Sequence, residues 1–77
     1  MKNKNEITVR LETAKAFVTH NAKDANPQIA EDIQGLLSQA MEEAKDDDID
    51  GLKQTLNLID SNPVNGWDLT SSVRSLL

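Results

Sequence analysis

The sequence predicts an all-α fold, a compact antiparallel bundle of three main helices plus a short C-terminal fourth helix, in one small domain over residues 1–77. Apolar residues recur at gaps of three and four, which places them on one side of a helix. Each of these apolar stripes also follows a residue that commonly caps helices. The stripes are Ile7, Leu11, Ala14 and Val18; Ile29, Ile33, Leu36, Leu37 and Ala40; Ile49, Leu52, Leu56 and Ile59; and Leu69, Val73 and Leu76.

The first helix is expected to begin at Asn3 or Asn5. Asn3 and Glu6 have the spacing of a capping box, in which each side chain bonds the other residue's backbone. The apolar stripe then continues without a break to Val18. Residues 20–25 are polar and are predicted to fray into a loop.

The dipeptide Asn26-Pro27 predicts the start of the second helix. Asparagine caps helices, and proline suits the first helical position, where its missing N–H costs nothing. This helix is expected to run to about Lys45. Its apolar face is the widest of the four, so we assign it the centre of the core, with Gly35 on the solvent side.

Two further aspartates predict the remaining helices. Asp48 can cap a third helix over residues 49–59. Residues 61–66 bring turn-forming residues together and predict a loop. Asp68 is then expected to cap a short fourth helix over residues 69–76.

The amino-acid composition excludes several classes of functional site. The chain has no cysteine and a single histidine, so thiolate zinc sites and His-pair metal sites are excluded. His20 is expected to be a cation near a helix C-terminus rather than a catalytic base. Phe17 and Trp67 are too few aromatics for a single-strand nucleic-acid platform. We therefore expect no enzyme activity and no cofactor.

The N-terminal segment MKNKNEITVR is polar, and no apolar run approaches the roughly 20 residues that span a bilayer. We expect a cytoplasmic protein that does not enter membranes. Charge is distributed unevenly along the chain. Residues 1–23 carry five Lys/Arg against two Glu, a net +3, whereas residues 24–50 carry one Lys against nine Asp/Glu, a net −8. The overall acidity of the chain argues against nucleic-acid binding, since such binding needs cations facing phosphates.

The segment Asp46-x-Asp48-x-Asp50-Gly51 resembles the first half of an EF-hand calcium loop. That resemblance implies carboxylate ligands for calcium. The sequence departs from the family where an apolar residue is expected, at Lys53, and where a bidentate glutamate completes the site, at Asn57. We therefore expect no metal here and interpret the segment as a solvated acidic turn with a helix cap.

The alternation of residues 7–11 is as typical of a strand as of a helix. Followed by two helices, it resembles the ribbon-helix-helix repressors and antitoxins. The resemblance implies DNA binding, with Thr8 and Arg10 of a paired N-terminal strand facing the major groove. This is the alternative function that the sequence leaves open.

Three apolar residues suggest contact surfaces outside the core. Val9 lies roughly opposite Ile7 on its helix, and Leu58 roughly opposite Leu56. On a chain this small, they suggest a surface for a homodimer or another protein. Trp67 is expected to fold back over the open end of the core, with an exposed binding anchor as the alternative.

The main expectation is a small acidic, non-enzymatic protein-interaction module: a stoichiometric regulator, inhibitor or immunity-type protein. Its partner is expected to be another protein with a basic surface, because clustered acids attract oppositely charged partners. The candidate protein-binding residues are Glu42, Glu43, Asp46, Asp47, Asp48, Asp50, Val9, Leu58 and Trp67.

Overall fold

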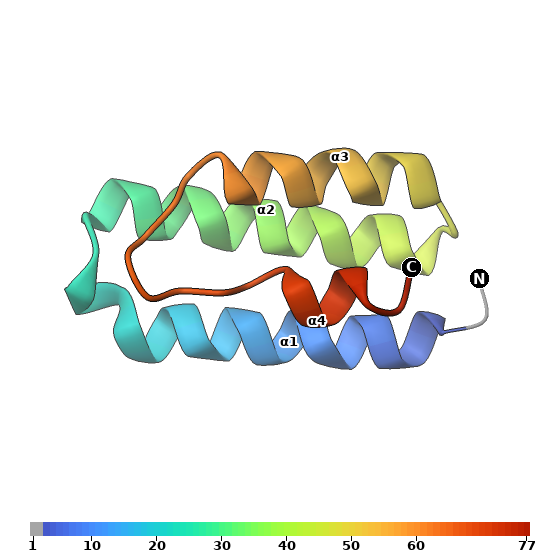
Figure 1. The fold of residues 1–77 in the computed structure, drawn as a ribbon, viewed down its shortest axis with the longest axis horizontal. Coiled ribbons are helices and arrows are strands. Elements are labelled where there is room, and N and C mark those ends of the chain that lie inside the picture. Colours follow the sequence, from blue (N-terminus) through green and yellow to red (C-terminus); the bar gives the residue numbers. More distant parts are fainter. Residues whose placement is uncertain (1–2) are drawn as a thin grey trace.

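The computed structural model describes residues 3–77, in which every regular element is helical and no strand occurs. In Figure 1 the chain runs along α1, returns along α2 and reverses again along α3. The all-helical fold class is therefore confirmed. The elements are α1 (Lys4–Asn21), a short 3-10 helix η1 (Ala22–Asp24), α2 (Pro27–Lys45), α3 (Ile49–Asp60) and α4 (Ser71–Arg74).

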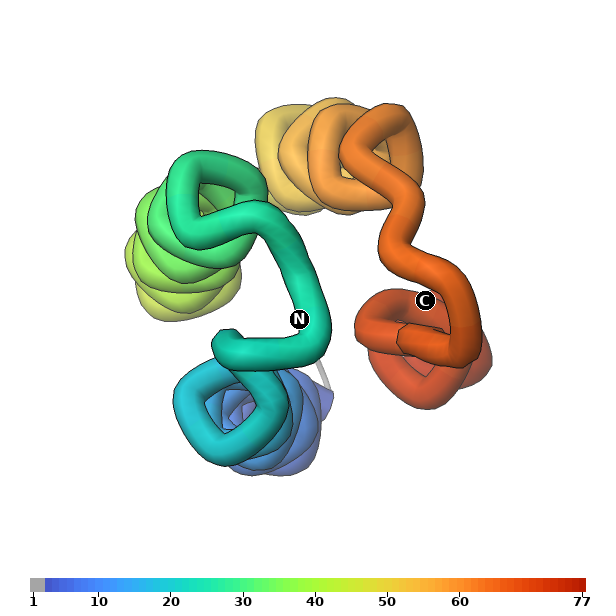
Figure 2. The backbone as a smooth tube through the Cα atoms, turned by 90° about the vertical axis from the view of Figure 1, so that its left-hand side faces the viewer, coloured from blue at the N-terminus to red at the C-terminus, as the bar shows by residue number. Residues whose placement is uncertain are grey.

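Helix α2 is the centre of the packing, because its backbone runs close to both α1 and α3, whereas the backbones of α1 and α3 do not approach each other closely. Figure 2 shows the four helices at the corners of a square, with α4 between α1 and α3. Helix α4 packs against α1. Its Arg74 reaches α3, where Nη2 donates to Asp60 Oδ2 at 2.8 Å and to Asn57 Oδ1 at 3.0 Å. The C-terminal segment thus closes the fourth side of the bundle.

The core draws on all four predicted stripes. Every residue of the first stripe is buried, whereas Ile49 of the third stripe remains 39% exposed. Ile49 is the first residue of α3 and precedes the part of the helix that faces α2. Ile29, Leu36, Leu69 and Leu76 are half-buried against the core. The buried apolar residues are Ile7, Leu11, Ala14, Val18, Ala30, Ile33, Leu37, Ala40, Ala44, Leu52, Leu56, Ile59 and Val73.

Helix α2 has the predicted bounds. The Asn26 side chain accepts a hydrogen bond from the Gln28 N–H at 2.8 Å, with Pro27 in the first helical position. At the start of α3, Asp48 Oδ1 accepts from the Gly51 N–H at 3.0 Å. Both predicted caps are confirmed.

The prediction for the first helix was partly wrong. Asn3 occupies the N-cap position, but its side chain makes no cap bond and instead donates to the Leu76 carbonyl at 3.3 Å. Glu6 pairs with Arg10 at 2.8 Å rather than completing a capping box. The helix also extends through Asn21, and residues 22–24 form η1 instead of a loop.

The fourth helix is shorter than predicted, covering Ser71–Arg74 instead of residues 69–76. Thr70, rather than Asp68, occupies the N-cap position and makes no side-chain cap bond, but Asp68, two residues earlier, accepts from the Ser71 N–H at 3.2 Å. Thr70, however, is buried and donates to Asp60 Oδ1 at 2.8 Å, which ties the preceding residues to α3 rather than to a helical turn. At the other end, Leu76 and Leu77 donate to carbonyls three residues back, so the helix passes into turns.

Candidate protein-binding surface

Six acidic residues at the end of α2, in the turn that follows and at the start of α3 form what we call the acidic corner (Glu42, Glu43, Asp46, Asp47, Asp48 and Asp50). The Asp48 N–H donates to the Glu43 carbonyl at 2.9 Å, and the Asp47 N–H to the Ala44 carbonyl at 3.3 Å. This pair of bonds is the Schellman motif, in which the residue after the helix cap is left-handed. Asp47 has φ of 57°, a conformation that aspartate adopts more readily than most residues. The turn therefore brings three successive carboxylates together at one end of the bundle.

Two acids of the corner have structural roles. Glu43 is half-buried and accepts a hydrogen bond from the Thr55 hydroxyl of α3. Thr55 is itself buried and accepts from Gln39 Nε2 at 3.2 Å, so this network joins α2 to α3. Asp48 is engaged as the cap of α3. The sequence predicted Glu43 to be a surface acid. Its partner Thr55 lies twelve residues away, and no local sequence pattern reveals a contact at that distance.

The other four acids of the corner are exposed. Asp47 lies 3.6 Å from Lys4 Nζ, and Glu42 lies 3.8 Å from Lys45 Nζ. Asp46 and Asp50 make no ion pair within residues 3–77. Most of the negative charge of the corner therefore faces solvent.

A shallow groove beside α2 carries further acidic residues and is separate from the corner. Gly35 lies in this groove, and a methyl group built there would meet no atom within 4 Å. Half-buried Leu36 supplies an apolar patch, and Glu31 and Asp32 add negative charge. The groove is lined by Glu31, Asp32, Gly35, Leu36, Gln39 and Asn62.

The structure does not combine the other candidate residues with the acidic corner. Val9 is 58% exposed on α1, and Leu58 is 49% exposed on α3. Their exposure is as predicted, but they lie on different helices whose backbones do not approach each other closely. Trp67 lies in the connection between α3 and α4, which Figure 1 places toward the end of the bundle opposite the α2–α3 turn.

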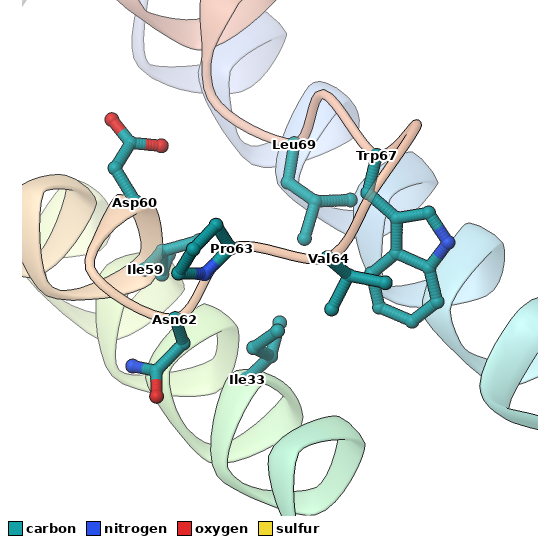
Figure 3. Close-up of a pocket in the computed structure, with 8 residues that line it drawn as sticks. All are labelled: Ile33, Ile59, Asp60, Asn62, Pro63, Val64, Trp67 and Leu69. Carbon is teal, nitrogen blue, oxygen red and sulfur yellow. The ribbon is translucent and has the colours of Figure 1, made fainter. Parts of the chain in front are cut away.

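Trp67 covers the core, as its favoured interpretation predicted. Its ring meets Phe17 of α1 edge to face, with centroids 5.6 Å apart and planes at 84°. Figure 3 shows it beside a cavity of about 90 Å³ beneath residues 60–69. Asp60 also lines the cavity, and its carboxylate is bonded to Thr70 and Arg74. The lining residues are Ile33, Ile59, Asp60, Asn62, Pro63, Val64, Trp67 and Leu69.

Residues 7–11 lie within α1, so the strand expected for the ribbon-helix-helix alternative is absent. Thr8 donates to the Lys4 carbonyl at 3.0 Å. Arg10 donates to the Ser72 carbonyl at 2.7 Å and to Ser75 Oγ at 3.2 Å, so it fastens α4 to α1. The uninterrupted apolar stripe outweighs the local alternation because it buries a whole helix face. Neither side chain is presented by a strand to a DNA groove.

Across residues 3–77, no cluster of histidine and acidic side chains has the arrangement to hold a metal ion. His20 is exposed near the end of α1. None of the described helices is long and apolar enough to cross a membrane. No known family, curated protein or solved structure gives a significant match to this chain.

Proposed function

We propose that the protein is a small non-enzymatic interaction module, a regulator, inhibitor or immunity-type protein that binds stoichiometrically to a basic surface on another protein. The observation that supports this proposal is the exposed negative charge gathered at the acidic corner. Glu42, Asp46, Asp47 and Asp50 are exposed within one short segment. The ion pairs of Asp47 and Glu42, at 3.6 and 3.8 Å, are themselves solvent-exposed.

Exposed ion pairs contribute only about 0–1 kcal/mol, so these two do little to neutralise the corner. A cluster of like charges raises the local potential and speeds the approach of oppositely charged partners. The same cluster repels itself in the isolated fold. Electrostatics of this kind act mainly on the association rate and on partner choice, while dissociation depends on close contacts.

The test begins with capture of binding proteins from a lysate of the native host on the immobilised protein. The association and dissociation rates of a captured partner are then measured by surface plasmon resonance at increasing salt. We expect the association rate to fall steeply with salt, because screening shortens the range of the field. The dissociation rate should hardly change.

The structure specifies matched variants for this experiment. The pair Asp46→Asn and Asp50→Asn removes two exposed charges that make no ion pair within the described residues. The control pair, Glu12→Gln and Asp24→Asn, removes two exposed charges away from the corner, on α1 and η1. The corner pair should slow association and the control pair should not. Equal effects of both pairs, or an association rate indifferent to salt, would contradict the proposal.

A further inference from the structure

The turn that seats Trp67 contains the one Asn-Gly pair of this sequence, Asn65-Gly66. The Trp67 N–H donates to the Val64 carbonyl at 3.0 Å and closes the turn. Gly66 has φ of 87°, which the third residue of such a turn requires and which glycine adopts without strain. Val64 and Trp67 both line the cavity shown in Figure 3. The conformation of Asn65 and Gly66, which lie between them, therefore sets the position of the Trp67 indole relative to the core.

Among the described residues, no hydrogen bond holds the Asn65 amide or the Gly66 N–H away from a reaction between the two. Both residues are exposed. Within residues 3–77, neither the Asn65 amide nor the Gly66 N–H takes part in a hydrogen bond. A methyl group built on Gly66 would meet no atom within 4 Å, so no other part of the chain packs against that side of the turn.

We propose that Asn65 is a site of spontaneous deamidation and isomerisation, and that the reaction unseats Trp67. The Gly66 backbone nitrogen loses its proton to solvent base and attacks Cγ of Asn65. A new C–N bond forms, the Cγ–Nδ2 bond breaks, and Nδ2 leaves as ammonia. Water then opens the five-membered succinimide at either carbonyl. One product is aspartate, and the other is isoaspartate, in which the main chain runs through Cβ and Cγ.

The isoaspartyl product lengthens the main chain by one carbon between Val64 and Gly66. The bond from the Trp67 N–H to the Val64 carbonyl then loses the atom spacing that a four-residue turn provides. The product also places a new negative charge at position 65, two residues before Trp67 and three before Asp68. Loss of the turn separates Trp67 from Phe17 and uncovers both aromatic rings. The reaction is one-way and slow, so it records the age of each molecule.

Other asparagines of the chain serve as internal controls. Asn62 lies in the same connection but precedes Pro63, whose nitrogen carries no proton and cannot form the succinimide. Asn26 likewise precedes Pro27. Asn57 lies within α3 and accepts from Arg74. The proposal therefore predicts that Asn65 reacts in the folded protein while Asn26, Asn57 and Asn62 do not.

The test incubates the folded full chain at mildly alkaline pH and follows it by peptide mapping with mass spectrometry that separates aspartyl from isoaspartyl products. A synthetic peptide of residues 61–70 is incubated in parallel. We expect conversion at Asn65 and none at Asn62, with a substantial isoaspartyl fraction. An intact Asn65 at the time when the peptide has converted would overturn the proposal, because the folded turn would then be protective.

The second half of the proposal is measured by fluorescence, since Trp67 is the sole tryptophan of the chain. Its emission should shift to longer wavelength in proportion to the isoaspartyl fraction. The variant Asn65→Gln should keep both its mass and its emission over the same period. The variant Asn65→Asp carries the charge without the extra carbon and should keep the emission of fresh protein. An aged protein with full isoaspartyl content and unchanged emission would show that the turn tolerates the longer chain, and this half would fail.

Discussion

At the scale of single residues, identical side chains behave differently because their surroundings differ. Asn26 and Asn3 both precede a helix, and the sequence predicts a capping role for each. Only Asn26 caps with its side chain, because Pro27 fixes the first helical residue beside it. The Asn3 amide instead donates to the carbonyl of Leu76, which is distant in sequence. Local chemistry could be predicted from the sequence, whereas a partner brought in by folding could not.

The two helical glycines also differ in their surroundings. Gly35 lies inside α2 and is exposed, with empty space where a methyl group would go. Gly51 lies in the first turn of α3, and a methyl group there would collide with the Asp48 carboxylate and lie 2.6 Å from Glu43 Oε2. The Asp48 carboxylate is the one that caps α3. Gly35 therefore has room for a side chain, whereas a side chain at Gly51 would displace the carboxylate that caps α3.

We predict opposite effects for alanine at these two positions. Gly35→Ala should raise the free energy of unfolding by about 0.5–1 kcal/mol, since alanine loses less backbone entropy than glycine in a helix. Gly51→Ala should lower it, because the cap must move. Urea denaturation of both variants measures the two changes. A shift of the same sign in both would show that steric space does not decide the outcome.

At the scale of helices, boundaries set by neighbouring residues could be predicted and boundaries set by distant contacts could not. Helix α2 begins and ends where the sequence indicates. Helix α4 does not, because the Thr70 hydroxyl is bonded to Asp60 of α3. For the same reason, the sequence placed Glu43 on the surface and did not anticipate its bond to Thr55. The acidic corner itself was visible in the sequence, since its charges are consecutive.

The cap of α4 gives a prediction about pH. Hydrogen bonds from the side chain and backbone N–H of Ser71 hold the pKa of Asp68 below its ordinary value. A carboxylate with a lowered pKa stabilises the folded state above its unfolded pKa, and this contribution disappears as pH falls through the folded pKa. We expect the Ser71 amide proton shift to titrate with a midpoint below about 3.9, the ordinary aspartate pKa.

The variant Asp68→Asn is the control for this titration. Its amide oxygen can still accept from the Ser71 N–H, but it carries no ionisable proton. The titration of the Ser71 amide should therefore vanish in the variant while the resonance stays near its neutral-pH position. A midpoint at or above the ordinary aspartate value in the unaltered protein would contradict the role assigned to this cap.

At the scale of the whole molecule, negative charge is concentrated at one end of the bundle. The chain has a net charge of −5, and the acidic corner lies at one end of a body measuring 35 × 18 × 17 Å. The radius of gyration is 11.6 Å, close to the roughly 11.5 Å expected for a folded chain of this length. Val9 and Leu58 are exposed on different helices, α1 and α3. Partner binding through the corner and contact through either apolar residue can thus be distinguished.

We predict weak self-association through Val9 or Leu58, with the opposite salt dependence to partner binding. Salt screens repulsion between two acidic copies, so it should strengthen a homodimer while slowing the approach of a basic partner. Sedimentation equilibrium at several salt concentrations measures this, with Val9→Ser and Leu58→Ser showing which residue is buried. A monomer at high concentration and a melting temperature unchanged by dilution would exclude the dimer.

The position of α4 between the backbones of α1 and α3 has a consequence for synthesis on the ribosome. Three helices emerge before the segment that occupies the gap between two of them. Until Val73 and its neighbours follow, the nascent bundle has an open side and lacks part of its apolar cover. Such a surface attracts chaperones and other unfinished chains. Docking of α4 therefore covers these apolar residues. A chain terminated before α4 would be helical but prone to aggregation.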